Sequence, residues 1–523
     1  MSEQSERMPE ELGSPLLGVE ARLRDITPAI LYADSWINPN VRNLTKLFNH
    51  LRTMYRILYG YLPRQVISDM PQPGINRHQW EEGTLMFTDL TGFTPLLEGN
   101  SKHGKEGAQS LLEILNGYFS EMLVIVSKSG GNLLEFTGDA LLVQFPTDRQ
   151  GRDTSRAVRA GLRMQRAMAK YAKIETEFGD YSLGMRIGLH VGRFLIADIG
   201  TPHRMEHVLL GNCVLRTKLA EGNGKPGYVC LTDEAKERVM DEFHFLSKHK
   251  KGYSLVKDDL SEEELGDYDI LPPRTRMASM VLFDTSREGL ITAITDSVEK
   301  VEPLASFIPR PLLHMLVENA AARGLPPDFP DASVLFVNLL GVPDNLSDFT
   351  EAERDEIVSE FSRVVSLVNA EIESAGGVMK KVTYHHAGPD IMAFFGVPDA
   401  HTNDTLRAVT AAYQIKDIIS RLKPLKLGST DIQLEAHIGL TQGRVFSAEI
   451  GESQGRREYN IMGNTVNTAA RLMDHAQANE ILVSEEVYDD LVAENFEAEK
   501  LEAVTLKGRS VPLDLYLIGR KKR

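Results

Sequence analysis

The chain carries one structural unit twice. "TLMFTDLTGF" begins at Thr84 and "SVLFVNLLGV" begins at Ser333, and each reads as a short apolar strand followed by a turn. Asp89 and Asn338 hold matching positions 249 residues apart. The offset stays nearly constant along the chain, which indicates a unit of roughly 200 residues that has been duplicated. Two similar domains are therefore expected.

Each copy predicts the same order of elements. An apolar strand leads into a long helix that ends at paired glycines (130–131 and 376–377), and a hairpin, a helix, a strand pair, a helix and a closing strand follow. Thr350 and Glu353 predict a capping box on the long helix of copy two. This β-α-β-β-α-β order, with additions, predicts an α+β fold: a ferredoxin-like antiparallel sheet with helices on one face.

Four regions follow from this pattern. Residues 1–80 are expected to be mostly helical, residues 81–240 to form the first domain and residues 331–520 the second. Residues 241–330 are expected to connect them, because "KDDLSEEELGDYDILPPRTR" is acidic and then contains prolines.

Composition restricts the partners. A net charge of −16 argues against nucleic acid and anionic membrane as partners, so a polyanionic substrate must meet a local cluster of Lys and Arg. The two cysteines exclude a disulfide framework and fit a reducing cytoplasm. "LLEILNGYFSEMLVIV" is interrupted by polar residues at helical spacing, which predicts an amphipathic helix rather than a membrane span. The polar, acidic N-terminus has no secretory signal pattern.

Two acids of copy one mark a candidate metal site. Asp89 ends a strand and is followed by Thr91, Gly92 and Phe93, a turn whose backbone N–H groups could line an anion. Asp139 lies in a hairpin turn that this fold places beside the same strand. The two carboxylates are therefore expected to converge and to hold a hard cation such as magnesium. Taken singly, each acid is typical of an ordinary turn.

Copy two supplies the complementary groups. Asn467 and Arg471 replace two leucines of copy one and, being four residues apart, share one helix face. An amide and a guanidinium on one face can orient a ribose and neutralise charge growing on a phosphate. In the hairpin, Lys381 stands where copy one has Glu135.

The losses in the two copies are mutually exclusive. Copy two has Asn338 in place of the first acid, and its second acid position is expected near His385 or His386. Copy one lacks the amide, the guanidinium and the hairpin lysine. This pattern predicts one composite site between the domains, with acids from copy one and cations from copy two, beside a degenerate cleft that needs neither.

These motifs resemble those of the class III nucleotidyl cyclases. "FTDLTGFT", "FTGDALLVQF" and "EYNIMGNTVNTAARLM" occur in the family's order, within about residues 60 to 520. Tandem units without membrane spans are similar to those of soluble adenylyl cyclases. The resemblance implies conversion of ATP to cyclic AMP and pyrophosphate by a head-to-tail domain pair within one chain, which is compatible with a monomer. No GxxxxGK[ST] loop occurs in the chain.

The resemblance also implies catalytic roles. Asp89, Asp139 and the Leu90 carbonyl would hold two magnesium ions, for which manganese could substitute. Asn467 would position the ribose, and Arg471 would stabilise charge on the α-phosphate.

Substrate contacts follow in the same way. Lys507 matches a lysine that contacts the terminal phosphates, and Arg193 is a weaker candidate for that task. Lys381 and Asn460 stand where adenylyl members read adenine with a Lys and an Asp or Thr. A lysine donates to adenine N1 but would face the N1–H donor of guanine, so ATP is favoured.

The degenerate cleft carries its own expectation. Its positions that accept bicarbonate in soluble mammalian relatives are Glu135 and Lys218 here, and we expect these two to pair and to close the cleft to an anion. Two alternatives stay open: a catalytically silent nucleotide-binding module and a guanylyl cyclase.

Overall fold

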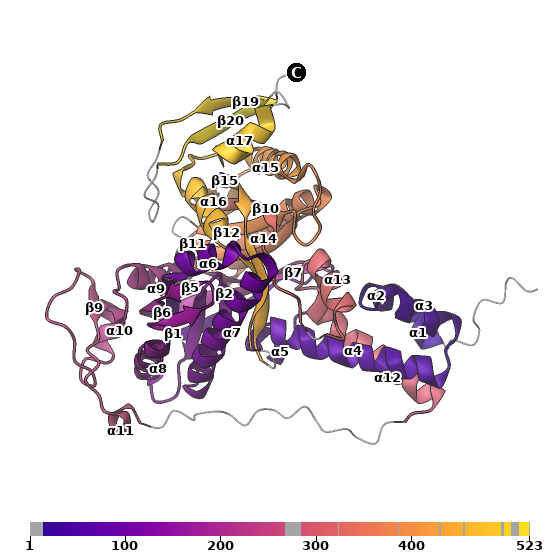
Figure 1. The fold of residues 1–523 in the computed structure, drawn as a ribbon, viewed down its shortest axis with the longest axis horizontal. Coiled ribbons are helices and arrows are strands. Elements are labelled where there is room, and N and C mark those ends of the chain that lie inside the picture. Colours follow the sequence, from indigo (N-terminus) through magenta and orange to yellow (C-terminus); the bar gives the residue numbers. More distant parts are fainter. Residues whose placement is uncertain are drawn as a thin grey trace, which may run out of the picture.

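The computed structural model describes residues 14–266, 284–322, 324–385, 388–427, 430–452, 455–492, 496–503 and 512–521. Figure 1 shows two sheet-containing lobes and an arm of helices. We call residues 77–265 the first lobe, residues 331–521 the second lobe, and residues 14–68 with 287–318 the helical arm.

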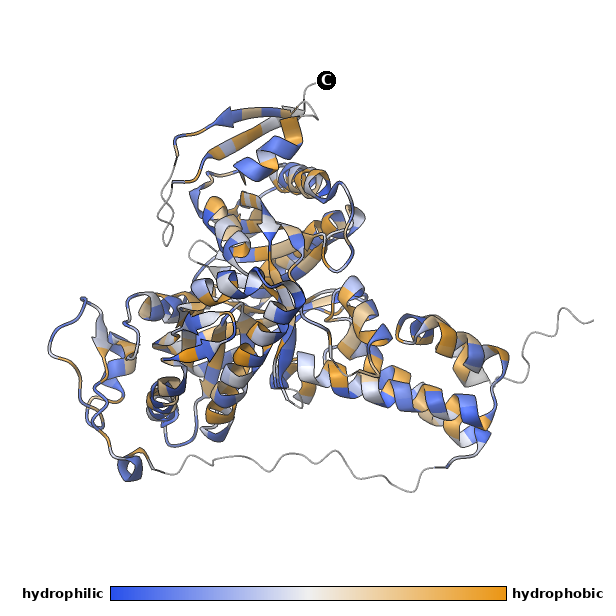
Figure 2. Cartoon of the chain, in the orientation of Figure 1, coloured by the Kyte–Doolittle hydropathy of each residue, from blue (hydrophilic) through white to orange (hydrophobic). Residues whose placement is uncertain are grey.

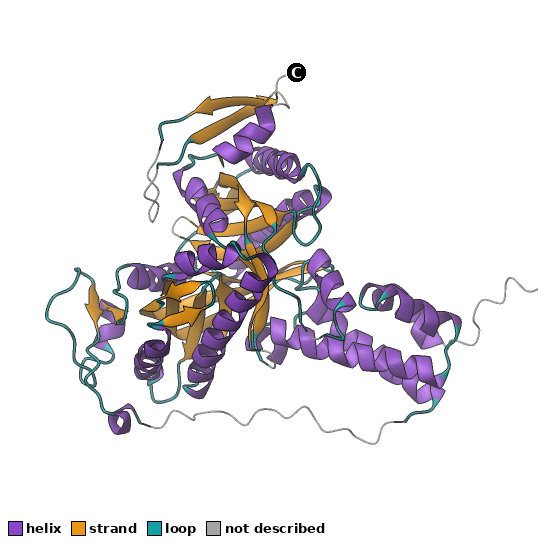
Figure 3. Ribbon diagram, in the orientation of Figure 1, coloured by secondary structure: helices purple, strands orange, loops and turns teal. Residues whose placement is uncertain are grey.

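Figure 3 shows the strands of each lobe in orange, with helices beside them. The main sheet of the first lobe has the strand order β2-β3-β1-β6-β8-β9, with β7 paired to β6. All neighbours are antiparallel except β6 and β8, which are parallel because a helix, α9, crosses over between them. The expected antiparallel sheet is therefore mixed at this edge. The strands of this sheet are β1 (Arg77–Thr91), β2 (Asn132–Thr137), β3 (Ala140–Pro146), β6 (Gly184–Thr201), β7 (Arg204–Leu210), β8 (Val229–Thr232) and β9 (Tyr253–Leu255). A separate two-stranded sheet is made of β4 (Ile174–Thr176) and β5 (Gly179–Tyr181).

The second lobe repeats this sheet with the order β11-β12-β10-β15-β18-β20-β19, and the pair β15–β18 is again parallel. The predicted ferredoxin-like arrangement is thus present twice. The strands of this sheet are β10 (Asp331–Leu340), β11 (Val378–His385), β12 (Gly388–Phe395), β15 (Glu435–Arg444), β18 (Glu480–Ser484), β19 (Phe496–Lys500) and β20 (Leu515–Lys521). Two separate two-stranded sheets are made of β13 (Leu425–Leu427) with β14 (Thr430–Ile432), and of β16 (Phe446–Gly451) with β17 (Arg457–Met462).

Helices cover both faces of each sheet, not one face as expected. In β1, Met86 packs towards α7 and α8, whereas Leu85 and Phe87 face the opposite side with residues of α9. The reason is that a helix that connects two neighbouring parallel strands must cross one face of the sheet. In the first lobe α9 crosses the face that α7 and α8 leave uncovered. The lobe helices are α6 (Phe93–Ser101), α7 (Gly104–Lys128), α8 (Asp153–Ala167), α9 (Asn212–Gly222), α10 (Asp233–Glu237), α11 (Glu262–Leu265), α14 (Glu351–Ser374), α15 (Asp404–Arg421), α16 (Asn464–His475) and α17 (Glu485–Val492).

Local signals set the ends of the long helices as predicted. α7 and α14 each stop just before a glycine in the left-handed region, Gly130 at φ 74° and Gly376 at φ 79°. The Thr350 side chain accepts from the backbone N–H of Glu353, and the Glu353 carboxylate accepts from Thr350, which completes the capping box.

The helical arm is itself part of the duplication. The pairs α4–α5 and α12–α13 both turn at a proline, Pro63 and Pro309, and α4 lies alongside α12 (Figure 1). Figure 2 shows polar outer faces on both helices, while their apolar sides form a core of their own. The stretch expected to connect the domains therefore includes structural helices. The arm helices are α1 (Ser14–Gly18), α2 (Glu20–Asp25), α3 (Ala29–Ile37), α4 (Val41–Tyr61), α5 (Arg64–Ser68), α12 (Arg287–Ala305) and α13 (Arg310–Glu318).

The two lobes exchange hairpins. The β16–β17 hairpin packs on α7, and the β6–β7 hairpin packs on α14. Equivalent hydrogen bonds accompany the exchange: Gly451 N donates to Asn116 Oδ1 at 3.1 Å, and Gly200 N donates to Ser362 Oγ at 3.0 Å. Matching residues thus make matching contacts, so the lobes form a head-to-tail pair related by a pseudo-twofold axis.

Among the residues that the structure describes, one helix, α7, is long and apolar enough to cross a membrane by length and composition. In the fold its apolar side chains, among them Tyr118 and Phe119, are buried in the core of the first lobe. The helix therefore has a packing role that accounts for its composition.

The exchanged hairpin gives a stability prediction. Phe446 begins β16, is fully buried and packs against Phe329 with ring centroids 5.3 Å apart. Phe446→Ala should lower the free energy of unfolding by about 3–5 kcal/mol because it leaves a cavity between the lobes. Urea denaturation checks this, with the exposed Val124→Ala as a control expected to change it by less than about 0.5 kcal/mol. Equal effects of the two changes would contradict the exchange.

Candidate functional site

The structure brings Asp89 and Asp139 together. Asp89 lies near the end of β1, and Asp139 lies in the turn between β2 and β3, where β3 is paired to β1 through Thr88 and Leu141. Burial, followed by repulsion from Asp89, raises the pKa of Asp139 to about 8. A buried carboxyl that holds its proton against a second carboxylate is a place where a cation would be stabilised.

Arg186 is a site residue that the sequence reasoning missed. It stands directly opposite Asp89 in the β1–β6 register, with Nη2 2.5 Å from Asp89 Oδ2 and Nε 2.7 Å from Glu221 Oε1. The guanidinium of Arg186 partly neutralises the charge of Asp89 and Glu221, and it is itself a cation beside the proposed metal-binding acids. The local sequence around Arg186, "GMRIG", contains no other charged residue and so gives no sign of a functional site. Arg186 is identified by the register of β1 against β6, which places it opposite Asp89.

The turn after Asp89 forms a tight strand-to-helix junction. β1 ends at Thr91, α6 begins at Phe93, and Gly92 between them has φ 86°. A Cβ on Gly92 would lie 2.2 Å from the Ser182 carbonyl oxygen, so only glycine fits. No side chain caps α6, and its first N–H groups are therefore suited to an anion. Leu90 buries its side chain in the core below.

The second lobe approaches the same junction with α16. A methyl group on Gly463, which precedes α16, would lie 3.5 Å from Leu97 of α6. Asn467 is one turn along, donating its N–H to the Gly463 carbonyl at 3.1 Å, and is exposed. Arg471 is half-buried on the side of α16 away from its core contacts. The amide and the guanidinium thus belong to the helix that faces α6. Lys507 lies outside the described residues.

Lys381 is deeply engaged at the interface. Its Nζ lies 3.1 Å from Glu135 Oε1 of β2 and 3.4 Å from Glu458 Oε1 of β17, and it donates to the Phe136 carbonyl. Burial disfavours the charged ammonium, but the carboxylates of Glu135 and Glu458 outweigh it, so the pKa of Lys381 is raised. Asn460, two residues from Glu458 on β17, is buried.

The predicted ion pair between Glu135 and Lys218 in the degenerate cleft is wrong. Glu135 pairs with Lys381, and Lys218 instead donates to the Tyr384 carbonyl at 2.6 Å, with its ammonium 5.4 Å from the centre of the Phe87 ring. The two hairpins that carry Glu135 and Lys381 meet across the pseudo-twofold axis, which the sequence could not reveal.

The degenerate cleft keeps one acid, at a shifted position. Thr383 pairs with Asp390 as Thr137 pairs with Ala140, so Pro389, rather than His385 or His386, matches Asp139. The β11–β12 hairpin simply extends further before it turns. Asn338 Nδ2 donates to Asp390 Oδ1 at 2.7 Å, and burial raises the pKa of Asp390 to about 8.

Arg193 does not join the acids. It stands opposite Glu82 in the β1–β6 register, seven residues along β1 from Asp89, which corresponds to about 23 Å at a strand rise of about 3.3 Å per residue. Its guanidinium stacks on Trp80, 4.9 Å from the ring centre. The phosphate contact proposed for Arg193 is therefore incompatible with this position.

A polar pocket of about 100 Å³ lies on the pseudo-twofold axis, closed by the ends of α4 and α12. Its charged lining, which we call the axial cluster, converges on Glu458: Lys380 at 2.6 Å, Lys381 at 3.4 Å and Arg456 at 3.9 Å. Burial opposes ionisation of Glu458, but these cations hold its pKa at about 2. The remaining charged members are Glu135 and Glu206.

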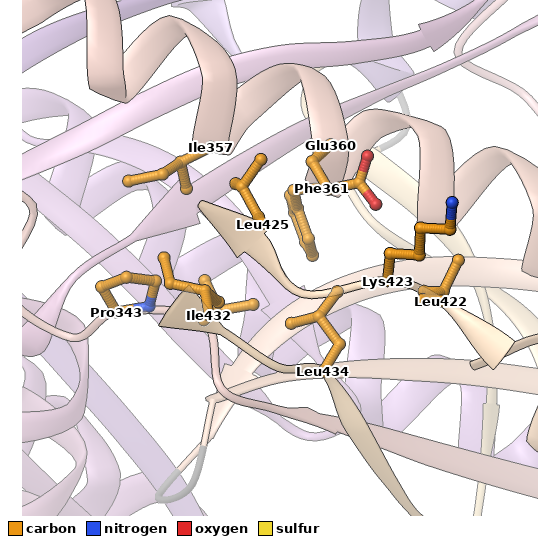
Figure 4. Close-up of a pocket in the computed structure, with 10 residues that line it drawn as sticks. Pro343, Ile357, Glu360, Phe361, Leu422, Lys423, Leu425, Ile432 and Leu434 are labelled. Carbon is orange, nitrogen blue, oxygen red and sulfur yellow. The ribbon is translucent and has the colours of Figure 1, made fainter. Parts of the chain in front are cut away.

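A second pocket of about 20 Å³ lies elsewhere in the second lobe (Figure 4). It is lined by apolar residues of α14, such as Phe361, and of the segment around β13 and β14, such as Leu425 and Ile432. None of the predicted site residues lines it. Among the described residues, no group of three or more His, Cys, Asp and Glu side chains could hold a metal ion by itself.

A known protein family matches the sequence of both lobes. The family described as "Adenylate and Guanylate cyclase catalytic domain" matches twice, at residues 75–264 and 328–519. Adenylate cyclase type 10 of Homo sapiens is 24% identical over 422 residues, which are 79% of this chain and 25% of that protein. An adenylate cyclase of Mycobacterium tuberculosis is 27% identical over 242 residues, 46% of this chain and 51% of that protein. The chain spans about a quarter of the type 10 relatives.

One solved structure is similar over both lobes. It is a class III adenylyl cyclase-like ATP-binding protein from Pseudomonas aeruginosa, with a TM-score of 0.54 and 16% identity, and the match covers 84% of this chain and 92% of that one. At this identity the likeness concerns the fold.

The axial cluster predicts a pH dependence. Burial raises the pKa of Glu206 from 4.5 to about 7, so the folded protein binds this proton more tightly than the unfolded chain. Stability should therefore fall as pH rises from about 5 to about 7.5, and Glu206→Gln should remove that part of the fall.

Urea denaturation of both proteins at the two pH values measures the effect. Glu237 is exposed, and Glu237→Gln is the control. Its free energy of unfolding should differ from that of the wild type by the same amount at both pH values. If the free energy of unfolding changes with pH equally in the wild type and in Glu206→Gln, the raised pKa of Glu206 is refuted.

Proposed function

Because this chain belongs to the family of adenylate and guanylate cyclase catalytic domains, we propose that it converts ATP into cyclic AMP and pyrophosphate at one composite cleft between its lobes. The single observation that carries this proposal is the placement of complementary groups on two facing elements. One acid lies near the end of β1, which precedes α6, and the other lies in the β2–β3 turn beside it. The amide and guanidinium lie on α16, and Leu97 of α6 lies close to Gly463 at the start of α16.

The acids of the first lobe suit divalent metal. Asp89 and Asp139, with the Leu90 carbonyl, would hold Mg²⁺, or Mn²⁺ in its place, since oxygen ligands are what these ions prefer. Burial and, after it, repulsion from Asp89 raise the pKa of Asp139, and a nearby cation would offset that repulsion, which supports a metal here. Bound metal would lower the pKa of the ribose 3′-hydroxyl and neutralise the triphosphate.

The chain's own groups would bind the phosphates. The uncapped start of α6, at Phe93, presents backbone N–H groups and the positive end of the helix dipole. Arg186, beside Asp89, is placed to leave that carboxylate for a phosphate oxygen when metal enters. Both groups supply positive charge locally to a chain whose net charge is −16.

The second lobe would stabilise the reaction itself. In the proposed step the ribose 3′-hydroxyl loses its proton to solvent water, and its oxygen forms a bond to the α-phosphorus. The bond from that phosphorus to the bridging oxygen breaks, and pyrophosphate leaves. Asn467 would hold the ribose, and the Arg471 guanidinium would offset the charge that grows on the α-phosphoryl oxygens. Neither group has a counterpart on α9, where Leu215 and Leu219 stand.

A second candidate is nucleotide binding without turnover. It is favoured by the name of the similar protein from Pseudomonas aeruginosa, an adenylyl cyclase-like ATP-binding protein. A complete set of acids, amide and guanidinium favours catalysis instead, since binding alone does not need a group aimed at transition-state charge.

Two substitutions test the proposed activity. Asp89→Asn should abolish cyclic AMP formation from Mg-ATP or Mn-ATP. Arg471→Ala should lower kcat by about a hundredfold, because it removes stabilisation of the transition state rather than of the ground state. Product is measured by chromatography of purified protein, with GTP and cyclic GMP assayed beside it.

Asp390→Asn is the matched control. Asp390 belongs to the degenerate cleft and already accepts from Asn338, so its isosteric replacement should leave the rate unchanged. A wild type that makes no cyclic nucleotide, or an Asp89→Asn variant that keeps full activity, would refute the proposed activity.

A further inference from the structure

Arg186 is held from two sides. Its Nη2 lies 2.5 Å from Oδ2 of Asp89, and its Nε lies 2.7 Å from Oε1 of Glu221, near the end of α9. The Glu221 side chain is 8% exposed, whereas that of Asp89 is 28% exposed. A metal ion that binds Asp89 would break the first contact and leave the second. Glu221 is therefore the more permanent partner of the arginine.

A glycine brings α9 within reach of Arg186. Gly188 follows Arg186 by two residues on β6, and a Cβ there would lie 2.1 Å from the backbone nitrogen of Glu221. Any other residue at this position would push α9 away from the sheet. The position of the Glu221 carboxylate is thus set by the packing of backbone against backbone.

The second lobe repeats this backbone contact with an apolar side chain. A Cβ on Gly439 would lie 2.3 Å from the backbone nitrogen of Met473, so Met473 of α16 holds the position that Glu221 holds on α9. Met473 is 1% exposed, and the acid that follows it, Asp474, is exposed. The fold therefore accepts a buried methionine here, and the packing of this helix on the sheet does not need a carboxylate.

The acid on the helix is lost together with the charged pair on the strands. Asp89 stands opposite Arg186 in the first lobe, and the matching pair in the second lobe is Asn338 opposite His437. A carboxylate that only supported the fold would have no reason to disappear with the metal acid and the arginine. Glu221 therefore belongs to the site rather than to the framework.

Metal binding gives this carboxylate a task. A divalent cation on Asp89 would stand close to the Arg186 guanidinium, and two positive charges at such a distance repel each other. Glu221 would then balance the guanidinium, and its attraction is strong because little water reaches it. Without this carboxylate, the arginine would turn away from the metal towards solvent.

We propose that Glu221 is a positioning residue, which keeps Arg186 beside the metal ions and directs its Nη groups to the phosphates of the nucleotide. A guanidinium that is anchored through Nε still presents both Nη nitrogens in one plane, which suits two oxygens of a phosphate. This inference rests on the proposed function, since it assumes that metal and a nucleoside triphosphate bind beside Asp89.

Glu221→Met tests this role with the side chain that the second lobe uses. Electrostatics alone predicts that a polyanion binds more tightly when a negative charge is removed. The proposed role predicts the opposite: affinity for a triphosphate should fall at least about tenfold, because the contact with Arg186 is lost. Affinity is measured by isothermal titration calorimetry of the full chain with α,β-methylene-ATP and Mg²⁺. Affinity that stays or rises overturns the proposal.

A double variant shows whether Glu221 acts through the arginine. Arg186→Gln added to Glu221→Met should lower the affinity by no more than about a further twofold, because the arginine has already left its place. A further loss of about tenfold would mean that Arg186 stays in place without Glu221, and this overturns the proposal. Should Glu221→Met fail to fold, the isosteric Glu221→Gln takes its part with the same expected losses.

Glu234→Met is the matched control. Glu234 of α10 forms an ion pair with Arg216 of α9 at 2.5 Å and is 44% exposed. Its removal should change the affinity for the analogue by less than about twofold. A loss equal to that in Glu221→Met would contradict the proposed role. A wild type that binds the analogue but forms no cyclic AMP refutes the proposed turnover alone, and a wild type that does not bind it overturns both proposals.

Discussion

The arrangement of the two lobes depends on the ion pair between Glu135 and Lys381. The residues occupy matching positions of the duplicated unit, and the pseudo-twofold axis brings them face to face. Two identical subunits would place two like charges there, and buried like charges repel strongly. Duplication within one chain allowed the two copies to take opposite charges, so divergence and association of the lobes are linked.

The same divergence separates the two clefts. In one, acids of the first lobe face the α16 residues of the second, and the group nearest to Asp89 is the cation Arg186. In the other, Asn338 satisfies Asp390, and Lys218 reaches across to the Tyr384 carbonyl. Each cleft thus keeps a buried acid with a raised pKa, but Asp390 accepts a hydrogen bond from Asn338, whereas Asp139 faces the second carboxylate of Asp89. The composite cleft also has the uncapped start of α6.

The helical arm extends this coupling. The ends of α4 and α12 close the polar pocket on the axis, and Arg456 of the second lobe donates to the Tyr61 and Gly60 carbonyls at the end of α4. Arg456 is also a member of the axial cluster that holds Glu458. The arm, the interface and the strand that carries Asn460 therefore share one set of buried charges.

The sequence by itself determined what short segments encode. Periodicity and turn residues gave the two copies, their hairpins, the glycine-terminated helices and the capping box of α14, and the strand–turn pattern led to the convergence of Asp89 with Asp139. Tertiary structure decided what depends on register and packing. Pairing of β1 with β6 selected Arg186 over Arg193, and the length of the β11–β12 hairpin moved the second acid position to Pro389. The meeting of the β2–β3 and β11–β12 hairpins gave Lys381, not Lys218, to Glu135. Asp89 and Arg186 lie about one hundred residues apart, and Glu135 and Lys381 lie about two hundred and fifty residues apart. At such separations local propensity carries no information, and only burial of the shared surface fixes which side chains meet.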